Sequence, residues 1–287
     1  MSFRDRFQNL KETVGQWTDS TGGGSLDRKI ERNLAEMEGG TEIERTAAVK
    51  ALVIQAQTDD KWADPIITSF LRVLPGQLAS PQEAIIDGLL ELRKVKVSRE
   101  EEIFESIQET LDSPYPSVRS KVVDIWTRFS LKSDAKTSDT IAVLFEMLSD
   151  DDKDVRYQTQ ESLSKILHTV PKVALPELKN AIGDDDWRVT YHSIVLLTEF
   201  AKKYPDPSVA LAPEVIEAFN SGERLKERAA DCIGMLGLAN PEAVKPAVPG
   251  LIKGLESKSS ELRKACATAL GRIGSKNGMV VYHAVPR

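Results

Sequence analysis

The sequence is poor in the residues that stabilise secreted proteins and β-sheets. It has 287 residues but only two cysteines, Cys232 and Cys266, and aromatic residues make up 6%. Both cysteines lie in apolar stretches, so we interpret them as buried free thiols, which favour a reducing, cytoplasmic location. No run of 18 apolar residues and no signal-type amino-terminal segment occurs, which argues against a membrane-spanning or secreted protein.

Motifs for catalysis and for cofactor or metal binding are also missing. The three histidines, His168, His192 and His283, stand apart from one another and from the cysteines, which disfavours a zinc or iron site. No Gly-x-Ser-x-Gly motif occurs, and the glycines at 22–24 lack the flanking residues of a phosphate loop. We therefore predict no catalytic residue, no cofactor and no metal, and that the protein is not an enzyme.

The acidic stretch at residues 149–156, Ser-Asp-Asp-Asp-Lys-Asp-Val-Arg, has some features of a calcium loop. Asp150, Asp152 and Asp154 have the right spacing, but Val155 occupies the position at which such a loop needs glycine. We interpret the stretch as a turn whose carboxylates cap the helix that follows.

The residues that are abundant favour helices and a folded core. Hydrophobic residues make up 41% and charged residues 29%, with Leu, Ala, Glu, Lys and Ile dominant. The formal net charge of −6 argues against a general nucleic-acid-binding protein, which usually carries a basic excess.

A repeat of about 37 residues runs through most of the chain. Equivalent positions recur at spacings of 32 to 38 residues: Arg45, Glu83, Arg119, Arg156, Arg188, Lys226 and Arg263. The residue seven positions after each is apolar: Leu52, Leu90, Trp126, Leu163, Val195, Ile233 and Leu270. A second apolar run precedes each marked helix, and in three repeats it follows a proline (Pro176, Pro213 and Pro249) suited to a first helical turn. Each unit therefore reads as helix A, a polar turn and helix B, and stacked units bury a continuous core.

The period, the acidic turns and the Val-Arg or Leu-Arg opening of helix B together resemble the HEAT-repeat family of armadillo-like α-solenoids. The resemblance covers residues 26–278 and implies an all-α, right-handed superhelical solenoid of about seven antiparallel helix pairs. It also implies that the A helices form the convex layer and the B helices the concave one. Aspartate and arginine would pair between adjacent repeats, and the stacking residues are Arg45, Arg119, Asp154, Arg156, Arg188 and Arg263.

The two ends of the chain differ from the repeats. Residues 1–20 are predicted to form an amphipathic helix with an apolar seam spaced four and three residues apart: Phe3, Phe7, Leu10, Val14 and Trp17. A Gly-rich linker at residues 21–25 follows. Three roles stay open for this helix: docking on the first repeat, association with a partner helix or a second copy, and peripheral membrane binding. Residues 279–287 are expected to be an irregular tail or the start of a truncated repeat.

The sequence favours a non-enzymatic scaffold or adaptor that binds a protein partner or peptide on its concave, helix-B surface. Trp187 and Arg188 are candidate anchors, since Trp and Arg dominate interface hot spots, although Trp187 can equally pack beneath the adjacent repeat. Basic residues near the ends of B helices are further candidates: Lys94, Arg128, Lys132, Lys165, Lys202 and Lys203. Complementing the helix dipoles also explains this basic edge. The alternatives are an enzyme resembling HEAT-like lyases or hydroxylases, and nucleic-acid binding along the basic edge.

Overall fold

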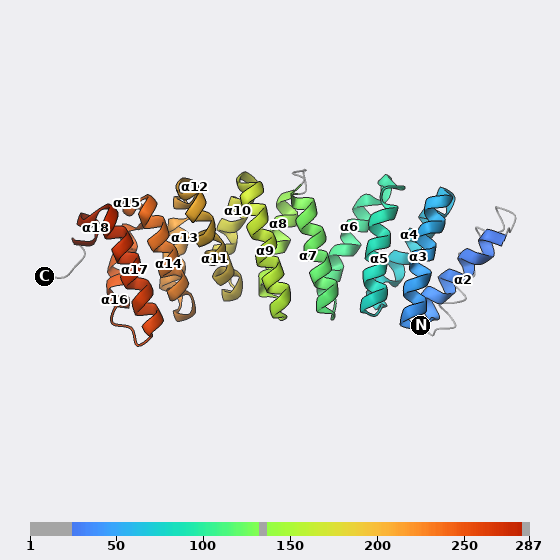
Figure 1. Cartoon of the computed structure of the whole chain (residues 1–287), viewed down its shortest axis with the longest axis horizontal. Coiled ribbons are helices and arrows are strands. Elements are labelled where there is room, and N and C mark those ends of the chain that lie inside the picture. Colours follow the sequence, from blue (N-terminus) through green and yellow to red (C-terminus); the bar gives the residue numbers. More distant parts are fainter. Residues whose placement is uncertain (1–24, 132–136, 283–287) are drawn as a thin grey trace. The chain divides into compact units, whose positions relative to one another are not determined.

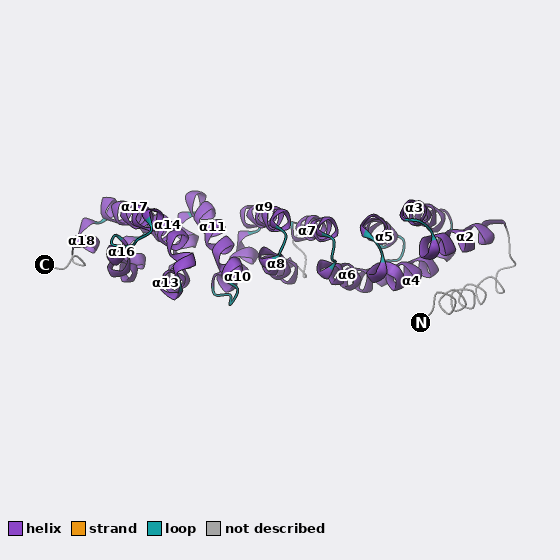
Figure 2. Ribbon diagram, turned by 90° about the horizontal axis from the view of Figure 1, so that it is seen from below, coloured by secondary structure: helices purple, strands orange, loops and turns teal. Residues whose placement is uncertain are grey.

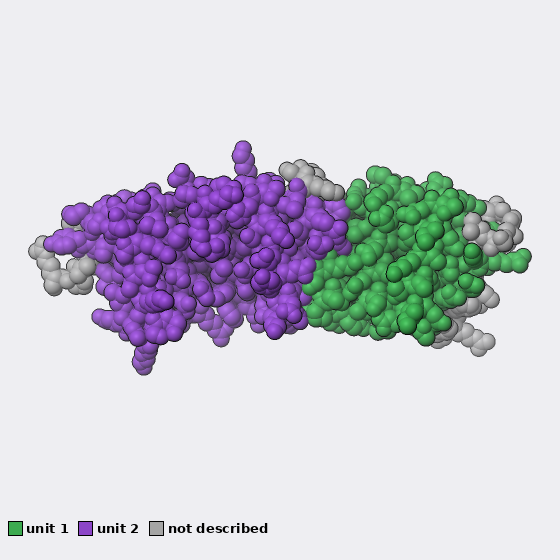
Figure 3. Space-filling view, in the orientation of Figure 1, with its two compact units in different colours: residues 1–122 green, residues 123–287 purple. Residues whose placement is uncertain are grey.

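The computed structural model describes residues 25–131 and 137–282, and their regular elements are all helices. The chain divides into two compact units, residues 1–122 and 123–287 (Figure 3). The N-terminal helix predicted for residues 1–20 lies outside the described residues. So does the predicted linker, apart from Ser25, which begins the first described helix.

The first unit contains three successive helix pairs, each made of a helix A and a helix B (Figure 1). The helices are α2 (Ser25–Gly39), α3 (Glu42–Thr58), α4 (Ala63–Val73), α5 (Ala79–Leu92), α6 (Glu100–Glu109) and α7 (Pro116–Ser130), the last of which continues past the boundary. Short 3-10 turns connect them: η1 (Asp60–Trp62), η2 (Leu74–Gly76), η3 (Val97–Arg99) and η4 (Thr110–Asp112).

The second unit contains four further pairs. The first two are α8 (Thr137–Glu146) with α9 (Lys153–Thr169), and α10 (Pro171–Ile182) with α11 (Trp187–Lys203). The next two are α13 (Ala212–Ser221) with α14 (Glu223–Ala239), and α16 (Val248–Gly254) with α17 (Ser260–Lys276). Shorter elements complete the unit: η5 (Met147–Ser149), α12 (Pro205–Val209), α15 (Pro241–Val244), η6 (Lys245–Ala247) and α18 (Gly278–Tyr282).

Within each unit the A helices form one layer and the B helices form the other (Figure 2). In the second unit, α9, α11, α14 and α17 lie along one side, and α8, α10, α13 and α16 lie along the other. The buried residues come mainly from the facing sides of these layers, for example Leu163 of α9, Leu178 of α10 and Ile233 of α14. The predicted all-α architecture of about seven helix pairs is thereby confirmed.

Polar residues at the A–B turns start the B helices. The Thr41 hydroxyl accepts the backbone N–H of Glu44, and the Glu44 carboxylate accepts the N–H of Thr41, which forms a capping box at α3. Asp152 Oδ1 accepts the N–H groups of Asp154 and Val155 at 2.8 and 3.2 Å and so caps α9. The capping role predicted for the acidic stretch therefore lies with Asp152.

Glycines allow the last two B helices to pack closely. A Cβ added to Gly234 of α14 would lie 2.8 Å from the Cα of Ala269 in α17. One turn further along α14, a Cβ on Gly237 would lie 2.5 Å from Cγ1 of Ile273. These two glycines therefore set the distance between α14 and α17, and with it the stacking of the last two repeats.

Two element boundaries differ from those expected. Helix α10 begins at Pro171, so Pro176 lies in its interior and not in its first turn, whereas Pro213 and Pro249 do occupy first turns. Residues 278–282 form the short helix α18, where the sequence suggested either an irregular tail or the start of a truncated repeat from residue 279. Val280 of this helix is buried, which explains why the segment is ordered against the last repeat.

Candidate functional site

The five described basic residues proposed for the B-helix ends are exposed, and three of them pair with a carboxylate about one turn away. Lys94 pairs with Glu91 at 2.9 Å, Arg128 with Asp124 at 3.0 Å and Lys202 with Glu199 at 2.6 Å. Lys203 lies 5.1 Å from the ring centroid of Tyr204, Lys165 is exposed, and Lys132 lies outside the described residues. This edge therefore offers little uncompensated positive charge.

The arginines assigned to stacking between repeats bind the turn of their own repeat. Nη1 of Arg119 donates to the carbonyl oxygen of Ser113 at 2.6 Å, and Nη1 of Arg263 donates to that of Ser257 at 2.8 Å. Arg156 makes the same contact with Asp150 at 2.5 Å, and Arg188 pairs with Asp186 at 3.3 Å. These contacts of the four arginines are thus within their own repeat, and not with the aspartates of the adjacent repeat as the expected ladder requires.

The contacts between consecutive repeats involve other side chains. Arg45 does reach the next repeat, where Nη1 donates to Oε1 of Gln77 at 3.2 Å. Asp154, by contrast, is exposed, and its carboxylate has no hydrogen bond or ion pair with a described residue. The remaining inter-repeat contacts include Ser80 with Glu42, Ser117 with Glu83, Lys121 with Asp87, and Lys179 with Glu214.

Aromatic and arginine side chains occur together on three consecutive B helices of the second unit. We call it the aromatic–arginine surface, and its members are Tyr157 and Gln160 of α9, Trp187, Arg188, Tyr191 and His192 of α11, and Arg224 and Arg228 of α14. Trp187, the first residue of α11, is 40% exposed, and Tyr157 is 67% exposed. Large apolar side chains with such exposure are unusual away from binding surfaces when they cluster.

Contacts at the repeat spacing hold this surface together. The guanidinium carbon of Arg224 lies 4.9 Å from the ring centroid of Trp187, a cation–π geometry. Nε of Arg228 donates to the hydroxyl of Tyr191 at 3.0 Å. Toward α9, His192 Nδ1 and Gln160 Oε1 are 2.7 Å apart, and since the amide oxygen accepts, the imidazole donates. These side chains are therefore held in fixed orientations before any partner binds.

The charge state of the surface follows from these contacts. The hydrogen bond to Tyr191 raises the pKa of Arg228, so this guanidinium stays charged. Burial, and then the positive charge of Arg156, lower the pKa of His192 below its ordinary value of 6.5, so the imidazole is neutral at pH 7. The surface therefore presents permanent positive charge on arginines beside neutral aromatic rings.

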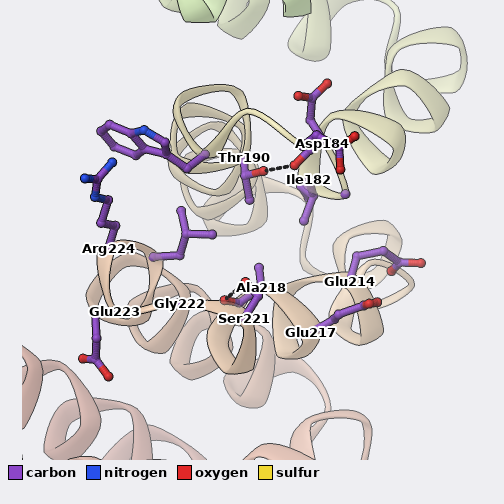
Figure 4. Close-up of a pocket in the computed structure, with 14 residues that line it drawn as sticks. Ile182, Asp184, Thr190, Glu214, Glu217, Ala218, Ser221, Gly222, Glu223 and Arg224 are labelled. Carbon is purple, nitrogen blue, oxygen red and sulfur yellow. Dashed lines mark hydrogen bonds between the residues drawn. The ribbon is translucent and has the colours of Figure 1, made fainter.

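A cleft lies beside this surface, between the α10–α11 turn and the α13–α14 turn (Figure 4). It has a volume of about 590 Å³. Ile182, Ala218 and Leu225 contribute apolar lining, and Arg224, which contacts the Trp187 ring, lies at one end. Carboxylates come from both turns and from α13: Asp184, Asp185, Glu214, Glu217 and Glu223.

Metal clusters and membrane-spanning helices are both absent from the part of the chain that the structure describes. No group of three or more His, Cys, Asp or Glu side chains is placed to hold a metal ion there. In the same residues, no helix combines the length and the apolar character needed to cross a bilayer. Cys232 and Cys266 are buried and unpaired, as predicted, and burial raises the pKa of the Cys232 thiol to about 12.

Of the residues on this surface, Trp187 and Arg188 were candidates from the sequence, whereas Tyr191, Arg224 and Arg228 were not. The missed signal is the repeat period itself, because Trp187 and Arg224 are 37 residues apart, and so are Tyr191 and Arg228. Side chains one period apart on adjacent B helices lie side by side, so an aromatic residue followed by an arginine at this distance predicts a stacked pair.

Comparison with known proteins identifies the repeats. Residues 104–198 match the family model for HEAT repeats, and residues 223–273 match that for a HEAT-like repeat, which together is about half of the chain. Among curated proteins, none matches the sequence.

Solved structures share the fold at low sequence identity. Kap121p bound to RanGTP is similar with a TM-score of 0.61 and 16% identity, over 96% of this chain and 34% of that one. Kap121p bound to Pho4p gives 0.58 and 15%, over 96% and 34%. Kap95p, from a structure with RanGDP, gives 0.53 and 15%, over 92% and 37%. This chain therefore spans about a third of the length of these proteins, and the likeness shows the fold.

Proposed function

Because this chain belongs to the HEAT-repeat family, we propose that it is a non-enzymatic scaffold that binds a protein partner or an extended peptide. The observation that carries the proposal is the aromatic–arginine surface on α9, α11 and α14. Trp, Tyr and Arg are the residues most often found at the centres of protein interfaces. Their contacts with one another hold the rotamers in place, which lowers the entropy cost of binding.

The similar structures support a macromolecular partner. Kap121p is described in complexes with RanGTP and with Pho4p, and these are protein partners of a protein that shares this fold. Identities of 15 to 16% transfer neither partner to this chain. We therefore propose a protein partner and not a particular one. A cytoplasmic location and an adaptor role remain predictions from the sequence.

Nucleic-acid binding is the weaker proposal. The basic residues at the B-helix ends have carboxylate neighbours, as Lys94, Arg128 and Lys202 show, and the chain has a net charge of −6. A strong phosphate-binding surface needs uncompensated Lys and Arg side chains. The arginines of the aromatic–arginine surface are instead engaged with aromatic rings. A protein surface fits this mixture better than a phosphate backbone does.

Affinity purification of variants tests the proposal directly. Tagged wild type is recovered from its native host, and the co-purifying proteins are compared with those of Tyr157→Ala and Tyr282→Ala. The two tyrosines have nearly equal exposure, 67% and 66%, but Tyr282 lies on α18, outside the aromatic–arginine surface. We expect a partner that is retained by wild type and by Tyr282→Ala and reduced at least fivefold with Tyr157→Ala.

Two results would contradict the proposal. If no protein co-purifies reproducibly with the wild type, the scaffold function fails. If a partner is retained equally by both variants, the protein is a scaffold but the aromatic–arginine surface is not its binding site. Circular dichroism melts of both variants check that neither substitution unfolds the chain.

A further inference from the structure

The cleft beside Trp187 combines an apolar floor with an excess of negative charge. Five carboxylates line it, against the single guanidinium of Arg224. Two of them, on Asp185 and Glu217, make no hydrogen bond or ion pair with a described residue. The apolar part of the lining comes from Ile182, Ala218 and Leu225. A ligand that fills this cleft needs an apolar stem and a cationic head.

Glu214 has one carboxylate oxygen that lacks a hydrogen-bond donor among the described residues. Its Oε1 pairs with Lys179 Nζ at 3.1 Å, across from α13 to α10. Its other oxygen, Oε2, is buried and accepts no hydrogen bond from a described residue. A buried carboxylate oxygen without a donor is costly, and a positively charged N–H group brought by a ligand would remove that cost.

Trp187 supplies the second half of the recognition. Its indole is 40% exposed at the end of the cleft, and Arg224 lies over the ring at 4.9 Å and so fixes its orientation. An exposed indole held in this way offers an apolar and π-rich surface for the segment that carries a long cationic side chain. Arg224 acts here as a positioning residue, because it contacts Trp187 and not the ligand.

From this geometry we propose that the cleft binds an arginine side chain of an extended segment of the partner protein. The proposal rests on the scaffold function proposed above and names the chemistry of the partner. Arginine fits better than lysine, because its planar guanidinium has five N–H donors and can bind two carboxylate oxygens at once. The guanidinium would bind Glu214 and Glu217, its stem would pack on Ile182 and Ala218, and a neighbouring part of the segment would pack on Trp187 at the Arg224 end of the cleft (Figure 4).

Charge decides against the other classes of occupant. An anionic ligand, a phosphate backbone or a lipid headgroup would meet the carboxylates of Asp184, Asp185 and Glu217, for which the described residues provide no ion pair, whereas Glu214 and Glu223 already pair with lysines. A neutral apolar segment would leave Asp185, Glu217 and Oε2 of Glu214 without donors. A second copy of this chain could fill the cleft only by inserting one of its own exposed arginines. Light scattering, described below, separates such a dimer from a complex with the partner by its mass.

The test uses a fluorescein-labelled peptide, Gly-Ser-Ala-Arg-Ala-Arg-Ala-Ser-Gly, and full-length protein, with binding followed by fluorescence anisotropy. The control peptide has citrulline in place of both arginines, which keeps the shape and removes the charge. We expect the citrulline peptide to bind at least tenfold more weakly. Binding of the arginine peptide should also weaken as salt is raised from 50 to 200 mM, as expected for partly exposed charges.

Protein variants locate the site. Glu214→Gln combined with Glu217→Gln should weaken binding of the arginine peptide at least tenfold, whereas Glu105→Gln, an exposed carboxylate on α6, should leave it unchanged. Lys179→Met should strengthen binding several-fold, because it frees Oε1 of Glu214 from its internal cation. Thermal melts establish that each variant is folded, and light scattering separates peptide binding from self-association.

Three results would overturn the inference: equal binding of the arginine and citrulline peptides, no binding of the arginine peptide at 1 mM, or unchanged binding by the double Gln variant. A failure of the arginine-binding proposal can be distinguished from a failure of the proposed scaffold function. If the native partner is lost with Tyr157→Ala but retained by the Glu214→Gln, Glu217→Gln variant, the protein is a scaffold and the cleft is not part of its site.

Discussion

The guanidinium of Arg156 donates a hydrogen bond from Nη1 to the carbonyl oxygen of Asp150 at 2.5 Å, six residues earlier in the chain. It also donates to the carbonyl oxygen of Asp151 at 3.0 Å. The same contact over six residues joins Arg119 to Ser113 and Arg263 to Ser257. The arginine near the start of helix B therefore closes the turn that precedes it, by satisfying carbonyl groups that no helix pairs.

Replacing this arginine should reduce stability and leave partner binding intact. We expect Arg156→Ala to lower the free energy of unfolding by about 1–3 kcal/mol, the usual effect of hydrogen bonds that involve a charged group. Urea denaturation measures this change, with Lys165→Ala as an exposed control on the same helix. An unchanged denaturation midpoint would show that the turn closes without the arginine. Loss of partner binding without loss of stability would place Arg156 in the binding surface instead.

The close packing of α14 against α17 predicts that replacing the glycine between them lowers stability. Gly234→Ala places a Cβ 2.8 Å from the Cα of Ala269, so the two helices must separate. Overpacking of this kind costs about 1–3 kcal/mol, which exceeds the roughly 1 kcal/mol that alanine gains over glycine in a helix. Gly271→Ala on α17 is the matched control, because nothing lies within 4 Å of its added Cβ. We expect Gly234→Ala to lower the melting temperature and Gly271→Ala to raise it.

The repeat architecture was predictable because it depends on a pattern and not on single contacts. Seven marked positions at a regular spacing identify seven B helices, and the apolar residue seven positions later is buried in four of them: Leu52, Trp126, Leu163 and Ile233. Helix formation and burial average over many side chains, so the exception at Glu83 does not disturb them. The partner of an individual side chain depends on one rotamer and one turn geometry, which a single sequence does not specify.

Glu83 shows where pattern reasoning ends. It occupies the position that is arginine in most repeats, and its carboxylate accepts a hydrogen bond from the Ser117 hydroxyl of the next repeat at 2.7 Å. At the equivalent positions Arg119, Arg156, Arg188 and Arg263 bind their own turns instead. The candidate site was likewise found only in part: Trp187 stood out by its type, whereas Glu214 of the cleft belongs to an A helix and had no distinguishing mark in the sequence.

The lowered pKa of His192 predicts how stability depends on pH. Above pH 6.5 the imidazole is neutral in both the folded and the unfolded chain. As the pH falls below 6.5, the unfolded chain takes up a proton before the folded one does, so stability declines until the folded-state pKa is reached. His192→Gln should flatten this part of the stability profile, measured by urea denaturation between pH 7.5 and 5. An equal slope in the variant would show that His192 does not contribute to it.

The first B helix has an uncovered apolar side. Ile43 and Ile54 of α3 are 82% and 63% exposed, and a separation of 11 residues, about three helical turns, places them on the same side. The N-cap residues Thr41 and Leu78 align α3 with α5, so Ile43 corresponds to Ser80, whose hydroxyl donates to Glu42 of α3 at 2.6 Å. Nearby on α5, Gly88 lies so close to α3 that an added Cβ would be 2.8 Å from Cγ2 of Val53. In the second repeat, α3 covers the corresponding side of α5. On α3 itself, no described residue covers this side.

The helix predicted for residues 1–20 has the length and the apolar seam to cover this side of α3. We therefore predict that Phe7 and Leu10 pack against Ile43 and Ile54, in the place of the helix B that precedes each later repeat. A double-mutant cycle tests this pairing without truncating the chain. Ile54→Ser should cost about 1–3 kcal/mol in the wild-type background if its side chain is covered, and much less when Phe7→Ser and Leu10→Ser are already present. Independent, additive effects in urea denaturation would exclude docking on α3 and would leave the seam free for a partner helix or a second copy, which concentration-dependent light scattering would then detect.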